Sequence, residues 1–482
     1  MNDNETIRTG TKKVVITVFT QAVILALSFI TGFILPKIMG PEEFGYWQIY
    51  LFYLGYLNLF GLGLNDGIGL FYGGYEYERL PFQRIRASMR VFFIYLIIVT
   101  VALFAAVSFA RDPTRQEIYQ VLALSVPSIC LQCIVLTVFL SVGKTGVYNV
   151  VNLLLKVLAT VAYVLLLSFH LSRSEDVMLA DFGVRIFVTV ICLVLGRRFL
   201  FGKAEPIRIG LREFWEKCRY GLNITFALIA ASFMPVAGRT IVEWNESAYV
   251  YGQYAFAMSI LHIIVTFTST FATLGTTVSA GVKAGTVIFP FLKRLSEEKL
   301  PEYYKKFSFI CSFLIYIAWF AYIPVVWIVR YFMKEYIPVL SYLYILLAMC
   351  LPLGRSQLLL TSYFKAYRME KAYLILNIVG VLAMMGITAG SYFIFHSIIS
   401  VAISTTVTMT IWCLCAELYL YHNVGGNFSW KDKLIEFIMM LMFVVSSSFG
   451  SLVLFILIYG LSFGCLLLLD RKRYLQLLKE KI

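Results

Sequence analysis

The chain has 482 residues, of which 60% are hydrophobic and 14% are charged, and its formal net charge is +14. Soluble domains carry about 25% charged residues, so this composition excludes a soluble globular protein and predicts a chain that lies in lipid. The sequence lacks the interleaved aromatic and basic residues typical of nucleic-acid surfaces, and its basic residues are therefore expected to face anionic lipid headgroups.

The apolar segments predict an all-α membrane protein. A helix needs roughly 20 mostly apolar residues to cross about 30 Å of hydrocarbon, and such windows recur from residue 14 to residue 469. We expect about fourteen spans, with twelve or thirteen as alternatives because the last apolar stretch is barely long enough for two helices. The predicted spans are 14–38, 44–72, 87–110, 117–142, 146–170, 177–198, 218–242, 247–281, 307–330, 336–364, 371–395, 397–421, 434–449 and 451–469.

The distribution of lysine and arginine predicts the orientation of these spans. With the N-terminus inside, 31 of these residues fall in the tails and inside loops and seven fall outside, while Lys156, Arg185 and Arg355 lie within spans. Basic residues concentrate in cytoplasmic loops, so both termini are expected in the cytoplasm. None of the nine cysteines falls in a predicted outside loop, and no disulfide is expected.

An internal repeat indicates two related halves. Residues 122–152 match residues 347–377 at seven of 31 ungapped positions, including Pro127 with Pro352 and Gln132 with Gln357. Both copies run in the same direction across the membrane, so the halves are predicted to be parallel repeats. The expected domains are a six-helix bundle at 1–198, a cytoplasmic linker at 199–217, a second six-helix bundle at 218–421, two extra helices at 434–469 and a basic tail at 470–482.

Cationic residues within the spans are the first candidates for a substrate site. Ionisable groups inside a membrane are costly and usually face a cavity or a partner. Lys156 and Arg355 have no obvious acidic partner on their own helix, so a cavity that binds an anionic ligand is the better interpretation. Arginine matches phosphate oxygens particularly well. Gln132 and Gln357 serve either helix packing or sugar binding, and the sequence does not decide between these roles.

The acidic residues within the spans have competing interpretations. Asp181 and Arg185 lie four residues apart on one helix face, where they either neutralise each other or contribute an ion-coupling carboxylate and a substrate-binding cation. Asp66 either caps a helix or couples transport to an ion. Glu417, close to a predicted span end, is expected to reach the headgroups. We expect no catalytic residue, no metal site and no cofactor.

Two segments carry a resemblance to a known family. The stretch Gly32–Tyr50 reads GFILPKIMGPEEFGYWQIY, and Gly61–Ile68 reads GLGLNDGI. The first resembles the outside turn after the first helix of bacterial polysaccharide flippases, and the second resembles the end of their second helix. Chain length, span number and the two-bundle repeat match this family, which is part of the MOP superfamily, across the whole chain.

The resemblance implies a function and a location. It implies a transporter rather than an enzyme, in the bacterial inner membrane, which flips an undecaprenyl-diphosphate-linked oligosaccharide from the inner to the outer leaflet by alternating access. The product would be used for O-antigen, capsule or exopolysaccharide. Expected partners are this lipid-linked substrate, membrane lipids, a polysaccharide polymerase and chain-length proteins. The alternative is a MATE-like multidrug/cation antiporter, whose cavity would favour carboxylates. A glycan polymerase or ligase is disfavoured because no long outside loop is present.

Overall fold

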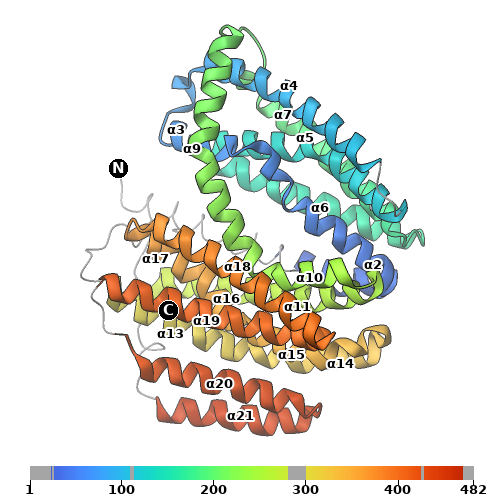
Figure 1. Ribbon diagram of the computed structural model, residues 1–482, viewed down its shortest axis with the longest axis vertical. Helices are drawn as coiled ribbons and strands as arrows, with labels where there is room; N and C mark the ends of the chain where they lie inside the picture. The colour runs from blue at the N-terminus through green and yellow to red at the C-terminus, as the bar shows by residue number, and fades with distance from the viewer. Residues whose placement is uncertain (1–22, 24–25, 109–112, 280–299, 425–427, 471–482) are drawn as a thin grey trace, which may run out of the picture. The chain divides into compact units, whose positions relative to one another are not determined.

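A computed structural model describes residues 23, 26–108, 113–279, 300–424 and 428–470 of the chain (Figure 1). The described residues are overwhelmingly helical and contain no strand, which confirms the all-α prediction. The chain divides into two compact units. The N-terminal unit comprises residues 33–230 with 247–252, and the described part of the C-terminal unit comprises residues 26–32, 231–246 and 253–470. The predicted linker at 199–217 and the domain boundaries stay predictions.

The N-terminal unit is organised around one helix, α5 (Pro113–Ser141). This helix contacts α2, α3, α4, α6 and α7, and 67% of its apolar window is buried, compared with 17% for α4. Both helices are strongly apolar, so their different burial comes from their positions in the unit rather than from their composition. The other elements are α2 (Leu35–Leu54), α3 (Leu64–Tyr72), α4 (Phe82–Val107), α6 (Thr145–Ser168), α7 (Ser174–Leu195), α8 (Arg197–Leu200) and most of α9 (Ile207–Phe233).

The predicted span 44–72 is not one continuous helix. It is divided into α2, a 3-10 turn at Leu57–Gly61 and α3, and the backbone at Leu62 and Gly63 is left-handed with φ of 49° and 70°. The glycines in this stretch permit the break. The Cys130 thiol donates a hydrogen bond to the Leu57 carbonyl at 3.7 Å, which partly satisfies a backbone oxygen in the interrupted segment.

Helix α3 contacts α9 through glycines. A Cβ atom on Gly67 would lie 2.2 Å from the Lys217 carbonyl oxygen, and one on Gly221 would lie 1.9 Å from the Gly63 carbonyl oxygen. No side chain fits at these distances, so the two backbones touch directly. Close backbone approach of this kind is how small residues hold membrane helices together, through dispersion contacts rather than through the hydrophobic effect. The glycines therefore serve close packing between α3 and α9.

In the C-terminal unit, α19 (Ile398–Val424) contacts α10, α15, α16 and α18. Helices α20 (Trp430–Ser448) and α21 (Leu452–Leu469) pack against each other, as Figure 1 shows, and α20 also packs on α15. The remaining elements are α10 (Ala237–Asn245), α11 (Ala248–Ser279), α13 (Leu300–Ala318), α14 (Tyr322–Phe332), α15 (Leu340–Ala348), α16 (Cys350–Arg355), α17 (Thr361–Ala366) and α18 (Glu370–Phe395).

The predicted span 336–364 is bent by 42° between α15 and α16. Pro352 lacks the backbone donor that a straight helix needs at this point. The Trp319 indole donates a hydrogen bond to the Leu347 carbonyl at 2.9 Å, so this oxygen is satisfied at the bend. A π-helical turn, Ser356–Leu360, follows Arg355 directly. In the repeated segment Pro127 lies inside the continuous helix α5, so the two halves differ here.

Nine helices in the described part of the chain are long and apolar enough to cross a membrane, or ten if the bent pair counts as one span. Other predicted spans are also helical but fail this test, because they are broken, as at α2 and α3, or carry charges, as in α9 and α20. The first predicted span, 14–38, lies partly outside the described residues. The polytopic all-helical fold is thus confirmed, although several spans are less regular than hydropathy alone suggests.

The glycine contact gives a matched test. We expect Gly67→Ala to destabilise the protein by about 1–3 kcal/mol, because the added methyl group overlaps the Lys217 backbone. Gly69→Ala, two residues away on the same helix, meets only the Thr137 methyl group at 3.5 Å. It should be neutral or stabilising by about 0.5–1 kcal/mol, since alanine favours the helix. The apparent unfolding temperature in detergent checks both variants. Equal temperatures for Gly67→Ala and Gly69→Ala would contradict the close backbone contact between α3 and α9.

Candidate functional site

A cluster of four charged side chains lies in the C-terminal unit. Arg355 ends α16, Glu417 lies on α19, and Lys433 and Glu436 lie one turn apart at the start of α20. Glu417 and Arg355 are 1% and 3% exposed. The cluster is therefore almost completely removed from solvent, and it joins α16 to the consecutive helices α19 and α20.

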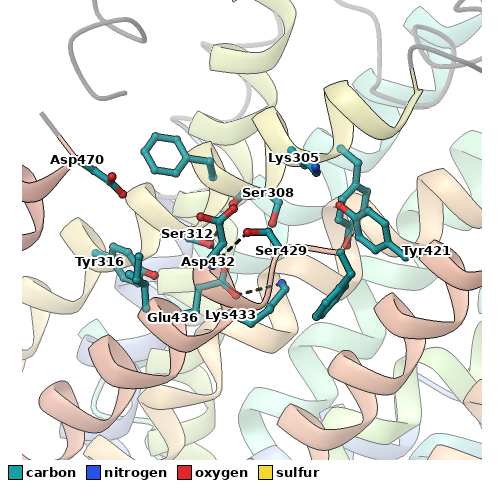
Figure 2. A pocket seen from close by; sticks show the side chains of 14 residues that line it. Lys305, Ser308, Ser312, Tyr316, Tyr421, Ser429, Asp432, Lys433, Glu436 and Asp470 are labelled. Carbon is teal, nitrogen blue, oxygen red and sulfur yellow. Dashed lines mark hydrogen bonds and ion pairs between the residues drawn. The ribbon is translucent and has the colours of Figure 1, made fainter. Parts of the chain in front are cut away.

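The contacts within this cluster are extensive. The Arg355 guanidinium donates to both carboxylate oxygens of Glu436, one of them at 2.6 Å, and its Nε lies 3.3 Å from Glu417 Oε1. Lys433 Nζ lies 2.5 Å from Glu417 Oε2 and 3.1 Å from Glu436 Oε2. Helix α13 adds two hydroxyl groups: Tyr304 donates to Glu417 at 2.7 Å, and Ser312 donates to Glu436 at 3.0 Å. Figure 2 shows Ser312, Lys433 and Glu436 from one side of the cluster.

Two cations face two carboxylates, so the cluster is electrically neutral. Removing either partner would leave an uncompensated buried charge, which costs far more than a surface ion pair is worth. The expectation that Glu417 reaches the headgroups is wrong: its carboxylate is buried because Arg355, Lys433 and Tyr304 bind it. The cluster also shows that α20 is fastened to the bundle by charge, not only by apolar packing.

Sequence reasoning missed part of this cluster. Arg355 is a site candidate from the sequence, but its acidic partners come from other helices. The absence of an acidic residue on its own helix therefore did not mean that Arg355 lacks a counter-ion. Glu436 lies within the predicted span 434–449, where a single carboxylate is itself costly. The Glu436 carboxylate, three residues after Lys433, is the sequence feature that indicates a buried ion pair in this span. The partners could not be assigned without the tertiary arrangement.

A second polar network lies in the N-terminal unit around Asp181. Its carboxylate is fully buried and accepts hydrogen bonds from Tyr50 at 3.0 Å, from Tyr163 at 2.5 Å and from Arg185 at 2.6 Å. The donors come from α2, α6 and α7. Three donors, one of them cationic, satisfy the oxygens of this buried carboxylate. The i,i+4 neutralisation considered for Asp181 and Arg185 is therefore present, with two tyrosines added.

Gln132 belongs to the same region. Its amide nitrogen donates to the Arg185 carbonyl and to Thr189 Oγ1, both at 2.8 Å, and thereby joins α5 to α7. Its repeat counterpart, Gln357, is exposed within the π-helical turn. Gln132 therefore serves helix packing, while the two glutamines have different surroundings despite their equivalent positions in the sequence.

The two remaining candidates have simpler surroundings. Asp66 lies in the first turn of α3 and accepts a hydrogen bond from the Thr225 hydroxyl of α9. Lys156 is exposed on α6. The structure therefore joins Asp181, Arg185 and Gln132 in one network, holds Arg355 in the charge cluster, and gives Asp66 a neutral partner.

The charge cluster can be tested by a double-mutant cycle. We expect Glu436→Gln to destabilise the protein by about 3–5 kcal/mol, because Arg355 is left without its main counter-ion. Arg355→Met should be similarly costly. The double variant Arg355→Met/Glu436→Gln should cost clearly less than the sum, since neither member of the pair remains unmatched. Apparent unfolding temperatures measure all three, and additive effects would argue against the pairing.

Comparison with known proteins identifies the fold. No protein-family model matches the sequence, and no curated protein matches it. Among solved structures, the lipid II flippase MurJ in an inward closed conformation has a TM-score of 0.60 at 13% identity, covering 95% of this chain and 99% of that chain. An inward-facing multidrug resistance MATE family transporter of the MOP superfamily has a TM-score of 0.56 at 14% identity, covering 83% of this chain and 94% of that chain.

An outward-facing MATE transporter is similar at a TM-score of 0.54 and 13% identity, covering 87% of this chain and 96% of that chain. Sequence identities this low establish the fold, but not the substrate. The chain is a multi-pass membrane protein with the helical architecture of the MATE transporters and MurJ.

Proposed function

We propose that this protein flips an undecaprenyl-diphosphate-linked oligosaccharide from the inner to the outer leaflet by alternating access. It acts as a transporter rather than an enzyme, and its product enters surface polysaccharide biosynthesis. The observation that carries this proposal is the match to MurJ. That lipid II flippase covers 95% of this chain, whereas the two MATE transporters cover 83% and 87%. The resemblance of Gly32–Tyr50 to polysaccharide flippases points in the same direction.

The residue roles follow from the surroundings of each cation. Lys156 is exposed on α6 within an apolar span, so it is our first choice for contacting the substrate diphosphate. Arg355 and Arg185 already bind carboxylates, so either would have to exchange a partner to bind phosphate. Gln357 is exposed and can contact head sugars, whereas Gln132 acts by fixing the position of α7.

Ion coupling is assigned to the acidic residues of the N-terminal unit. Asp66 and Asp181 are both candidates, and Asp66 is the stronger one. The described side-chain partner of Asp66 is the neutral hydroxyl of Thr225, whereas Asp181 is matched by the cationic Arg185. A carboxylate with a neutral partner gains more from taking up a proton or a sodium ion.

A MATE-like multidrug/cation antiporter is the second candidate. It is favoured by the MATE transporters among the similar structures. Cationic drugs would require an accessible carboxylate. Glu417, Glu436 and Asp181 are matched by Lys or Arg, which leaves Asp66, with its neutral described partner, as the candidate for this role. Uptake of a fluorescent cationic drug into proteoliposomes separates the two functions, because a flippase of this kind should not transport it.

The substrate role of Lys156 predicts a loss of transport. Lys156→Gln should reduce flipping of a fluorescent lipid-linked oligosaccharide in proteoliposomes roughly tenfold, which corresponds to about 1.4 kcal/mol of lost binding. Lys371→Gln, which removes an exposed lysine at the start of α18, is the matched control and should retain the wild-type rate. Equal rates for the two variants would refute the assignment, and a lack of flipping by the wild-type protein would refute the function.

The coupling role of Asp66 is tested separately. A proton or sodium gradient should accelerate flipping by the wild-type protein, and Asp66→Asn should abolish this acceleration while slow flipping continues. Asp181→Asn should instead lower the unfolding temperature, because Arg185 loses its counter-ion. If the wild-type protein responds to neither gradient, or if Asp66→Asn still responds, Asp66 is not the coupling residue.

A further inference from the structure

A groove lies beside the charge cluster in the C-terminal unit, between α16, α19 and α20. Its volume is about 260 Å³. Apolar side chains form most of its walls, and the buried charges of Arg355, Glu417, Lys433 and Glu436 lie at its floor. The apolar lining residues include Leu351, Leu414, Leu434, Phe437 and Met440, and Trp430 is the lining residue nearest the start of α20. Among the transport candidates above, Arg355 lines this groove, where Glu417 and Glu436 already bind it.

The length of the groove indicates the kind of molecule that fills it. Trp430 and Met440 are ten residues apart on α20, and a helix rises 1.5 Å per residue, so the groove extends for about 15 Å along this helix. The hydrocarbon core of a bilayer is about 30 Å thick. The groove thus covers the depth of one leaflet, which matches one lipid chain and is too short for a partner helix that crosses the membrane.

The chemistry at the Trp430 end matches a lipid headgroup. Trp430 is 64% exposed, and the neighbouring Lys431 is also exposed. Tryptophan residues lie at headgroup level in membrane proteins, and a lysine at that level attracts anionic phosphate. Below them the exposed residues of α20 are apolar, as with Leu434 at 59% and Phe437 at 54%. Along α20, residues suited to a lipid headgroup therefore come first, and residues suited to an acyl chain follow.

We propose that this groove binds one anionic glycerophospholipid from the leaflet that meets the start of α20. Its phosphate lies beside Trp430 and Lys431, and one acyl chain lies along Leu434, Phe437 and Met440. The bound chain keeps water away from the floor of the groove, which strengthens the ion pairs of the cluster because charges attract more strongly in a low dielectric. The site is independent of the transported substrate.

Native mass spectrometry of the full-length protein tests this proposal. The probes are phosphatidylglycerol and phosphatidylcholine, added to protein that is purified in detergent. The wild-type protein should retain one phosphatidylglycerol in preference to phosphatidylcholine. Leu434→Trp fills the groove and should reduce this retention at least fivefold. Leu441→Trp is the matched control, because Leu441 is an exposed α20 residue (48%) that does not line the groove.

Lys431→Gln is a second variant, which alters a surface side chain and leaves the apolar groove intact. It should remove the preference for phosphatidylglycerol. Equal retention of the two lipids by the wild-type protein would overturn the anionic assignment, and equal retention by Leu434→Trp and Leu441→Trp would overturn the location. A polyprenyl-linked lipid that copurifies in the groove, identified by its mass and displaced in Leu434→Trp, would assign the site to the substrate tail and overturn the phospholipid.

Discussion

Charge that is buried among membrane helices must be matched by opposite charge, and this constraint organises the C-terminal unit. Arg355, Glu417, Lys433 and Glu436 form a neutral set in which each charge contacts an opposite one. Tyr304 and Ser312 of α13 donate further hydrogen bonds to the two carboxylates. Because the four charges come from α16, α19 and α20, the positions of these helices are coupled. A shift of α20 would expose or separate charges that the hydrocarbon cannot solvate.

The N-terminal unit meets the same constraint with a smaller set. Asp181 is held by a cation and two tyrosines, and Gln132 connects α5 to the same helix. Here, however, backbone contact is as important as polar contact. Gly63, Gly67 and Gly221 allow α3 and α9 to touch, next to a helix break that places Asp66 at the start of α3. The two units therefore combine rigid, charge-matched centres with interrupted helices.

The sequence predicted the helical fold well, because hydropathy acts over whole spans and needs no tertiary information. It also identified Arg355, Asp181 and Arg185 as unusual. It could not predict that Arg355 binds Glu436, since these residues are 81 positions apart and belong to different helices. The sequence likewise does not predict the bend before Pro352, because the related Pro127 lies inside a continuous helix. At Pro352 the Trp319 indole, from a separate helical segment, binds the Leu347 carbonyl oxygen at the bend.

The separation of Arg355 and Glu436 along the chain also has a consequence for biosynthesis. Ribosomes add about 5–20 residues per second, so Glu436 is made about 4–16 s after Arg355. During this interval the guanidinium has already been synthesised while its main counter-ion has not. The C-terminal unit therefore cannot complete its core in the order in which its helices are made, and the last step of assembly must wait for α20. A ribosome that stalls before Trp430 would release a chain in which Arg355 keeps Glu417 but lacks Glu436, its main counter-ion. This incomplete cluster is a signal for quality-control proteases in the membrane.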